Sequence, residues 1–234
     1  MKSYKRIRKL TEVVSGLLES YEKNVTVADI GADHGYLSES LSRLDKIEKI
    51  LAVEISNKCL EKVIKLKQNF NLEKVEPILG NGLENIAYAD ISVIAGIGGY
   101  EIINIINDRT NISGESKCNI FVLQPSDNFV ELKTWINDNN LLVLRDFFFE
   151  SSKRFYPVIV IDASKTNKTE LTDFDLYLGR DSSLEDKEFV NYLKYLKESF
   201  GFLDGLSLER INNDEVLKQK QKLKILIEKL LDKC

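Results

Sequence analysis

A short loop between an apolar run and a helical pattern carries the residue types that can do chemistry. The run 25–30 predicts a strand, and apolar residues resume at helical spacing after Gly35. Between these segments, Gly31 and Gly35 allow sharp turns and let backbone amides come close to a ligand. A strand, a glycine-bearing loop and a helix are together typical of the cofactor loop in a doubly wound α/β fold.

A carboxylate, Asp33, stands in this loop where the dinucleotide fingerprint G-x-G-x-x-G has its second glycine. A carboxylate there would repel a pyrophosphate. It suits a ligand with positive charge and no phosphate, such as S-adenosylmethionine with its sulfonium and amino-acid end. Asp29, at the end of the predicted strand, also fits the D/E-x-G-x-x-x-G loop of class I methyltransferases. On the loop alone, other Rossmann-like domains stay open as alternatives.

Three further strand ends carry candidate binding residues. Glu54 ends the second apolar run, about 20 residues past the glycine loop, and is placed to accept both ribose hydroxyls; a solvated strand end is the alternative. Asn81, between two glycines, can offer a donor and an acceptor to an adenine edge, although Asn-Gly is also a strong turn pair. The glycines that begin at Gly96 leave room for a flat substrate base.

The rest of the pattern places these strand ends in one sheet. Strands are predicted over 25–30, 50–55, 75–79, 91–95, 120–123, 141–149 and 156–163, and the first five alternate with helices. The last two form a hairpin, so the final pair is antiparallel. Because dinucleotide dehydrogenases do not end this way, we expect an α/β fold of the class I, Rossmann-like methyltransferase type, with a doubly wound seven-stranded sheet.

Helical patterns precede and follow these strands in the sequence. An amphipathic helix is predicted over 4–22, and two more over 184–203 and 208–231. A short glycine turn joins the latter two, which predicts an antiparallel α-helical coiled-coil hairpin. A polar linker leads us to expect a methyltransferase domain over residues 1–165 and a helical domain over residues 166–234.

The net charge of −4 argues mildly against nucleic acid as a partner, but the distribution of charge says more. The first ten residues hold a cluster of lysines and arginines and no acidic residue, and the last helix carries a row of lysines. A local basic face is enough to attract phosphate even on an acidic protein. For the C-terminal lysines, a solvated helix face is the alternative.

Composition excludes several other classes. No apolar run reaches the roughly 18 residues of a membrane span, and the basic N-terminus lacks the apolar core of a secretory signal. The three cysteines are scattered, which indicates reduced thiols and a cytoplasmic protein. The single histidine excludes a multi-histidine metal site. We therefore expect no membrane and no metal, and we expect a monomer.

The sequence resembles the bacterial tRNA adenine-N1 methyltransferases of the TrmK type along its whole length. The matching stretches are ADIGADHGYL at 28–37, VE at 53–54, GNGL at 80–83, AGIGG at 95–99 and LQP at 123–125. The resemblance implies S-adenosylmethionine as cofactor, tRNA as substrate and N1 of adenine 22 as target. The chain departs from the family pattern at Asn81, Ile97 and Ser126, where the family usually has Asp, Met and Asn.

The resemblance also assigns roles to individual residues. Gly31, Asp33 and His34 would line the methionine end of the cofactor, Glu54 its ribose, Asn81 and Gly82 its adenine, and Gly96 and Ile97 the transfer site. Asp29, Gly35 and Ile55 complete the expected cofactor site.

Adenine N1 has its own lone pair, so the protein's main work would be alignment and exclusion of water. The base must be flipped or already unpaired. Asp33 is expected to stabilise the cationic product, and His34 is the candidate for proton handling at the adenine amino group. The alternative is that His34 only bonds the loop or the cofactor.

For the RNA, Arg6 and Arg8 are predicted to contact phosphates, and the C-terminal helices with Lys218 and Lys222 are predicted to clamp the folded tRNA. Two other function classes stay open. One is a class I methyltransferase that acts on a protein or a small molecule, and the other is a catalytically silent RNA-binding relative.

Overall fold

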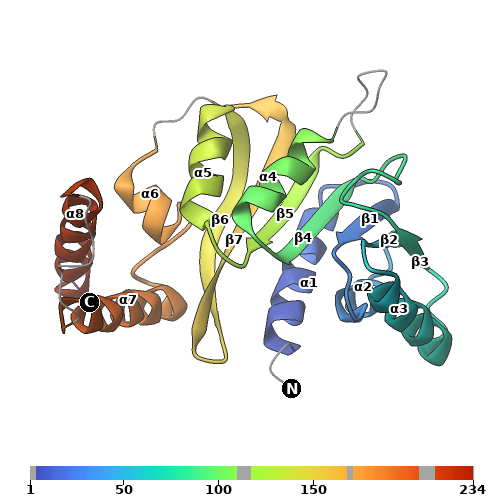
Figure 1. Ribbon diagram of the computed structural model, residues 1–234, viewed down its shortest axis with the longest axis horizontal. Coiled ribbons are helices and arrows are strands. Elements are labelled where there is room, and N and C mark those ends of the chain that lie inside the picture. Colours follow the sequence, from blue (N-terminus) through green and yellow to red (C-terminus); the bar gives the residue numbers. More distant parts are fainter. Residues whose placement is uncertain (1–3, 110–116, 168–170, 206–213, 234) are drawn as a thin grey trace. The chain divides into compact units, whose positions relative to one another are not determined.

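The computed structural model describes residues 4–109, 117–167, 171–205 and 214–233, and within these it forms a seven-stranded mixed sheet (Figure 1). The strands are β1 (Val25–Ile30), β2 (Ile47–Glu54), β3 (Val75–Leu79), β4 (Ile91–Ile97), β5 (Ile120–Pro125), β6 (Leu141–Ser151) and β7 (Arg154–Thr166). The helices are α1 (Tyr4–Leu18), α2 (Tyr36–Leu41), α3 (Asn57–Phe70), α4 (Gly99–Asn107), α5 (Phe129–Asp138), α6 (Asp173–Leu178), α7 (Lys187–Gly205) and α8 (Asp214–Leu231).

The strand order is β3-β2-β1-β4-β5-β7-β6. Strands β1 to β5 pair in parallel, whereas β7 runs antiparallel to β5. The order reverses between β1 and β4, and ligands of such sheets bind at the carboxyl ends of the strands beside this reversal. The predicted doubly wound α/β sheet with an antiparallel final hairpin is therefore confirmed.

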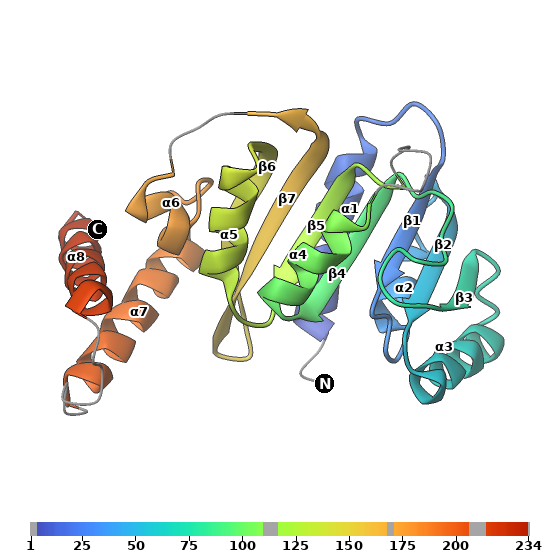
Figure 2. The same cartoon turned by 45° about the horizontal axis from the view of Figure 1, so that its top comes forward.

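Helices cover both faces of the sheet. Helices α4 and α5 contact each other on one face, and α1 lies on the other (Figures 1 and 2). Leu10 and Val14 of α1 are fully buried, and Thr11 donates a 2.9 Å hydrogen bond to Ser40 of α2. The central strands are buried on both faces, as their near-continuous apolar runs predict.

Element boundaries differ from the prediction at several elements, of which two examples follow, and one helix was not predicted. Helix α1 ends at Leu18 and not at residue 22, because turns follow it, and β2 begins at Ile47 and not at residue 50. Helix α6 was not predicted. It begins with a capping box in which Thr172 and Asp175 each bond the other's backbone, a signal that was present in the sequence.

Contacts divide the chain into two compact units, Met1–Arg145 with Val158–Thr169 and Asp146–Pro157 with Glu170–Cys234. The second unit thus includes the tip of the β6–β7 hairpin. There, the Phe148 and Phe155 rings lie 4.2 and 5.1 Å from the ring of Tyr192 on α7. The predicted boundary after residue 165 stays a prediction, since the chain enters the second unit twice.

Helices α7 and α8 contact each other within the second unit, and Leu223 and Ile227 of α8 are buried. The turn at 206–213 and the side chains from 200 to 220, which include Lys218, lie outside the described residues. The coiled-coil hairpin therefore stays a prediction. Across the described residues, no helix combines the length and apolar character needed to cross a membrane.

Candidate active site at the carboxyl ends of the strands

The glycine loop after β1 is shaped by three residues in the left-handed region. Gly31, Asp33 and Gly35 have φ of 76°, 46° and 73°. The amides of Gly31 and Ala32 both donate to the carbonyl of Val53, at 2.9 and 3.0 Å, which ties the loop to the end of β2. A Cβ on Gly31 would lie 2.9 Å from Cδ1 of Ile97, so this glycine permits the close approach of β4.

Glu54, at the end of β2, connects the glycine loop with the turn that follows β2. Its carboxylate is buried, with Oε2 accepting from the amide of Asp33 at 3.0 Å and Oε1 accepting from the amide of Ser56 at 2.9 Å. Each carboxylate oxygen has a second lone pair. Glu54 therefore stabilises the glycine loop, and a hydrogen bond from a ribose to Glu54 stays a prediction.

Asp29 is a buried carboxylate beneath the same loop. It is only 3% exposed, and its Oδ2 accepts a 2.6 Å hydrogen bond from the hydroxyl of Ser38 in α2. Burial raises the pKa of Asp29 to about 6, the hydrogen bonds of Ser38 oppose the rise, and the nearby charge of Glu54 adds to it. A cationic group that approached this carboxylate would favour its ionised form.

The predicted pair Asp33 and His34 lies at the surface and meets a third residue, Lys62 of α3. The ammonium of Lys62 is 3.6 Å from Oδ1 of Asp33 and 3.4 Å from Nε2 of His34, and that Nε2 is 3.7 Å from Oδ2 of Asp33. Lys62 can only donate, so a hydrogen bond from it needs Nε2 as the acceptor of a neutral imidazole. The sequence analysis did not include Lys62, because nothing local connects α3 to the glycine loop.

The ends of β3 and β4 present the remaining predicted residues. Asn81 is exposed at the end of β3, and Gly82, with a φ of 55°, packs against Ile105 of α4. Gly96 has a φ of 78°, and a Cβ there would lie 3.4 Å from Nη1 of Arg6. The guanidinium of Arg6 thus lies at the carboxyl end of β4. Ile55, which follows Glu54, is 67% exposed.

Two buried polar atoms near this edge have no hydrogen-bond partner among the described residues. They are Nε of Arg6 and Oε1 of Gln124. Gln124 is fully buried at the end of β5, and its Nε2 donates to the carbonyl of Pro125 at 2.8 Å. Phe121 and Leu123 belong to the core beneath α4 and α5, so alternation along the strand directs Gln124 to the opposite face, which α1 covers.

Gln124 is a residue that the sequence analysis missed as a site candidate. It belongs to the motif LQP at 123–125, directly before Ser126 in the departures from the family pattern. In the structure, the Ser126 hydroxyl donates to Oδ2 of Asp127 at 2.9 Å, and the Ser126 amide donates to the carbonyl of Ile97. An unpaired buried amide oxygen is the more informative group, because buried polar atoms normally have partners.

The structure brings the predicted cofactor residues together at one edge of the first unit, and the predicted RNA contacts belong to both units. Arg6 lies against Gly96, whereas Arg8 is exposed and forms an ion pair with Glu12 at 3.3 Å. Lys222 is exposed on α8, in the second unit. Within the described ranges, no group of three or more His, Cys, Asp and Glu side chains is placed to hold a metal ion.

Comparison with known proteins identifies the family. The sequence profile of the tRNA (adenine(22)-N(1))-methyltransferases, TrmK, matches residues 27–232. The chain belongs to the TrmK family. A relative from Mycoplasma genitalium is 30% identical over 164 residues, which cover 68% of this chain and 71% of the relative. The tRNA (adenine(22)-N(1))-methyltransferase of Bacillus subtilis is 26% identical over 159 residues, 66% of each chain.

Solved structures of TrmK proteins share this fold. TrmK of M. capricolum, in complex with S-adenosyl-homocysteine, superposes with a TM-score of 0.73 at 23% identity and covers 97% of this chain and 96% of its own. A Streptococcus pneumoniae protein in complex with S-adenosyl-L-methionine gives a TM-score of 0.76 at 22% identity and covers 97% and 98%. These likenesses confirm the class I methyltransferase type of fold.

Proposed function

We propose that the carboxyl ends of β1, β2, β3 and β4 bind S-adenosylmethionine, and that the edge between β4 and β5 receives the target adenine of tRNA. As a TrmK protein, the chain is a tRNA (adenine-N1)-methyltransferase that uses this cofactor. The residue roles below are our assignment. The observation that carries them is a glycine loop with three carboxylates, Asp29, Asp33 and Glu54, directed to or beside it.

The fit of the cofactor to these residues rests on charge and on space. Phosphate groups would be repelled by the three carboxylates, whereas a sulfonium and an ammonium would be attracted. Gly31 and Gly96 both have a positive φ. A side chain at Gly31 would meet Ile97 and one at Gly96 would meet Arg6, so the backbone of these two glycines lines the site directly. Glu54 then offers its unused lone pairs to the ribose, and Asn81 and Gly82 lie at the next strand end for the adenine.

When bound, the cofactor supplies an electrophilic methyl group. The N1 lone pair of the target adenine forms the new bond to the methyl carbon, the carbon–sulfur bond breaks, and its electron pair goes to sulfur. The positive charge moves from the sulfonium to the adenine. The protein's part is to hold N1 in line with the methyl group and to exclude water.

Gln124 and Arg6 are the groups that we assign to the adenine. The unpaired Oε1 of Gln124 can accept from the exocyclic amino group, which leaves N1 free and increases its electron density. Arg6 can donate its unpaired Nε–H to a second acceptor of the base or to its phosphate. Gly96, against which the Arg6 guanidinium lies, belongs to the same strand end. Asp33 is suited to offset the positive charge that develops on the base, and a neutral His34 is suited to take a proton.

The deciding experiment combines binding and product analysis. Calorimetry of the full chain should give micromolar binding of S-adenosylmethionine and no binding of NAD or ATP. Incubation with unmodified tRNA and the cofactor, followed by nuclease digestion and mass spectrometry, should locate 1-methyladenosine at position 22. Preference for NAD or ATP, or methylation of another nucleoside, would refute the assignment. Cytoplasmic location and a monomeric state stay predictions.

A further inference from the structure

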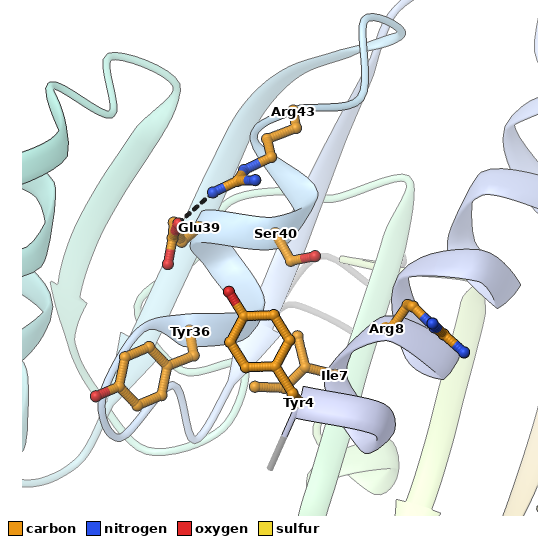
Figure 3. A pocket seen from close by; sticks show the side chains of 7 residues that line it. All are labelled: Tyr4, Ile7, Arg8, Tyr36, Glu39, Ser40 and Arg43. Carbon is orange, nitrogen blue, oxygen red and sulfur yellow. Dashed lines mark hydrogen bonds and ion pairs between the residues drawn. The ribbon is translucent and has the colours of Figure 1, made fainter. Parts of the chain in front are cut away.

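A pocket of about 360 Å³ lies between α1 and α2, beside the glycine loop (Figure 3). Its walls come from two short stretches of chain. Helix α1 contributes Tyr4, Ile7 and Arg8, and α2 with the turn after it contributes Tyr36, Glu39, Ser40 and Arg43. All of these residues belong to the first unit. None of them has a role in the cofactor site described above.

Two tyrosine rings dominate the apolar part of this pocket. Tyr4 is 77% exposed and Tyr36 is 49% exposed, which is high for aromatic side chains. Figure 3 shows the two rings side by side in this view, Tyr4 from α1 and Tyr36 from the start of α2. The Tyr36 ring also stacks on the His34 ring of the glycine loop, with centroids 5.6 Å apart and planes within 10°. Tyr36 therefore connects the lining of the pocket with His34 of the candidate active site.

The polar part of the pocket holds two arginines whose side chains are each 71% exposed and form an ion pair with a glutamate. Arg43 bonds Glu39 at 2.6 Å, as the dashed line in Figure 3 marks, and Arg8 bonds Glu12 at 3.3 Å. Pairs of this kind at the surface contribute little to stability. A phosphate can therefore compete for either guanidinium, and it offers the bidentate geometry that arginine prefers.

We propose that this pocket binds one nucleotide of the tRNA next to the target adenosine, with its base on the rings of Tyr36 and Tyr4 and its phosphate between Arg43 and Arg8. The inference rests on the proposed function and extends it to a second RNA subsite. Exposed aromatic rings beside cations are the usual platform for an unpaired nucleotide. Because the target base must leave its stack, its neighbour loses a stacking partner that the tyrosines replace.

The size and position of the pocket favour a nucleotide within the RNA over a free one. A volume near the lower end of small-ligand pockets accommodates one nucleotide and little more. The rings are open to solvent, so a strand can enter and leave on both sides. Contact between Tyr36 and His34 places the bound base directly beside the glycine loop to which we assign the cofactor.

Three substitutions test the pocket in the full-length chain: Tyr36→Leu, Tyr4→Leu and Arg43→Gln. Each tyrosine substitution should weaken tRNA binding between roughly fivefold and a hundredfold, the range that loss of one base-stacking contact gives. Arg43→Gln should weaken tRNA binding and make it less dependent on salt, because it removes a phosphate contact. Calorimetric affinity for S-adenosylmethionine should stay within about twofold of wild type. Tyr36→Phe keeps the ring and should bind tRNA like wild type. Tyr88→Leu is the matched control, since Tyr88 is 50% exposed beside the amino end of β4.

The outcomes separate this proposal from the function on which it rests. If wild type fails to methylate tRNA, the proposed function is wrong. If wild type is active and the two tyrosine variants, folded by thermal melting, bind tRNA as tightly as wild type, the pocket assignment alone is overturned. Tight binding of free AMP to wild type, lost in Tyr36→Leu while tRNA affinity is unchanged, would overturn it in favour of a small-molecule site.

Discussion

Replacing Asp29 with asparagine tests the electrostatic state of the residue beneath the glycine loop. Asp29 is 3% exposed and accepts a hydrogen bond from Ser38, and burial raises its pKa to about 6. Asparagine keeps the shape and an oxygen that can accept from Ser38, but it cannot ionise. The substitution therefore removes the charge and leaves the packing at the end of β1 nearly unchanged.

The sign of the effect follows from proton binding in the two states. The unfolded chain releases the Asp29 proton near 3.8, whereas the folded chain holds it until about 6. Over this interval the folded state binds more protons, so the free energy of unfolding falls as pH rises. The difference between the two pKa values corresponds to roughly 3 kcal/mol at 1.36 kcal/mol per unit. This loss of folding stability is absent below about pH 4 and nearly complete above about pH 6.

Urea unfolding of the cofactor-free chain at several pH values between 4 and 7.5 measures this cost. Asp29→Asn should match wild type near pH 4 and exceed it by up to about 3 kcal/mol at pH 7.5. Asp33→Asn is the control for the loss of one carboxylate from the same loop, because the Asp33 side chain is 60% exposed. A constant difference between Asp29→Asn and wild type at all pH values would refute the reasoning.

Asp29→Asn should also respond differently to the cofactor. If the ionised carboxylate attracts the cofactor's cationic end, then binding releases a proton near pH 6, and wild-type affinity for S-adenosylmethionine falls as pH drops through 6. Calorimetry in buffers of different ionisation enthalpy detects that proton. In the variant the affinity should be lower at pH 7.5 and flat with pH.

Three further predictions concern the same site. Gln124→Leu should lower kcat roughly 10- to 100-fold with cofactor affinity unchanged, because it removes the unpaired oxygen that we assign to the adenine amino group. Single-turnover kinetics with tRNA measure the rate of methyl transfer, and an unaltered rate would remove Gln124 from the site. Glu54→Gln leaves one of two backbone amides without an acceptor and should reduce stability by about 1–2 kcal/mol and weaken cofactor binding, as urea unfolding and calorimetry would record. His34→Gln should lower the rate of methyl transfer if His34 takes a proton from the adenine amino group, and a rate equal to wild type in single-turnover kinetics would limit His34 to bonding the loop.

Much of the site was predictable from local patterns in the sequence. The alternation of apolar runs and helical stretches determined the strands, and the positive φ of Gly31 and Gly35 follows from a turn that only a residue without Cβ makes at low cost. Because parallel strands end at one edge, Glu54 and Gly96 could be assigned to the same site from their places at strand ends. These inferences need only neighbours in the chain.

Only the tertiary structure revealed the contacts between distant segments. Nothing near Gln124 in sequence indicates that its amide oxygen is buried without a partner, or that Arg6, from the first helix, lies against Gly96. The meeting of Lys62 with His34 and the pocket that Tyr4 shares with α2 depend on how helices cross the sheet. The periodicity of a helix determines which side is buried, whereas its partner on that side depends on packing between elements far apart in the chain.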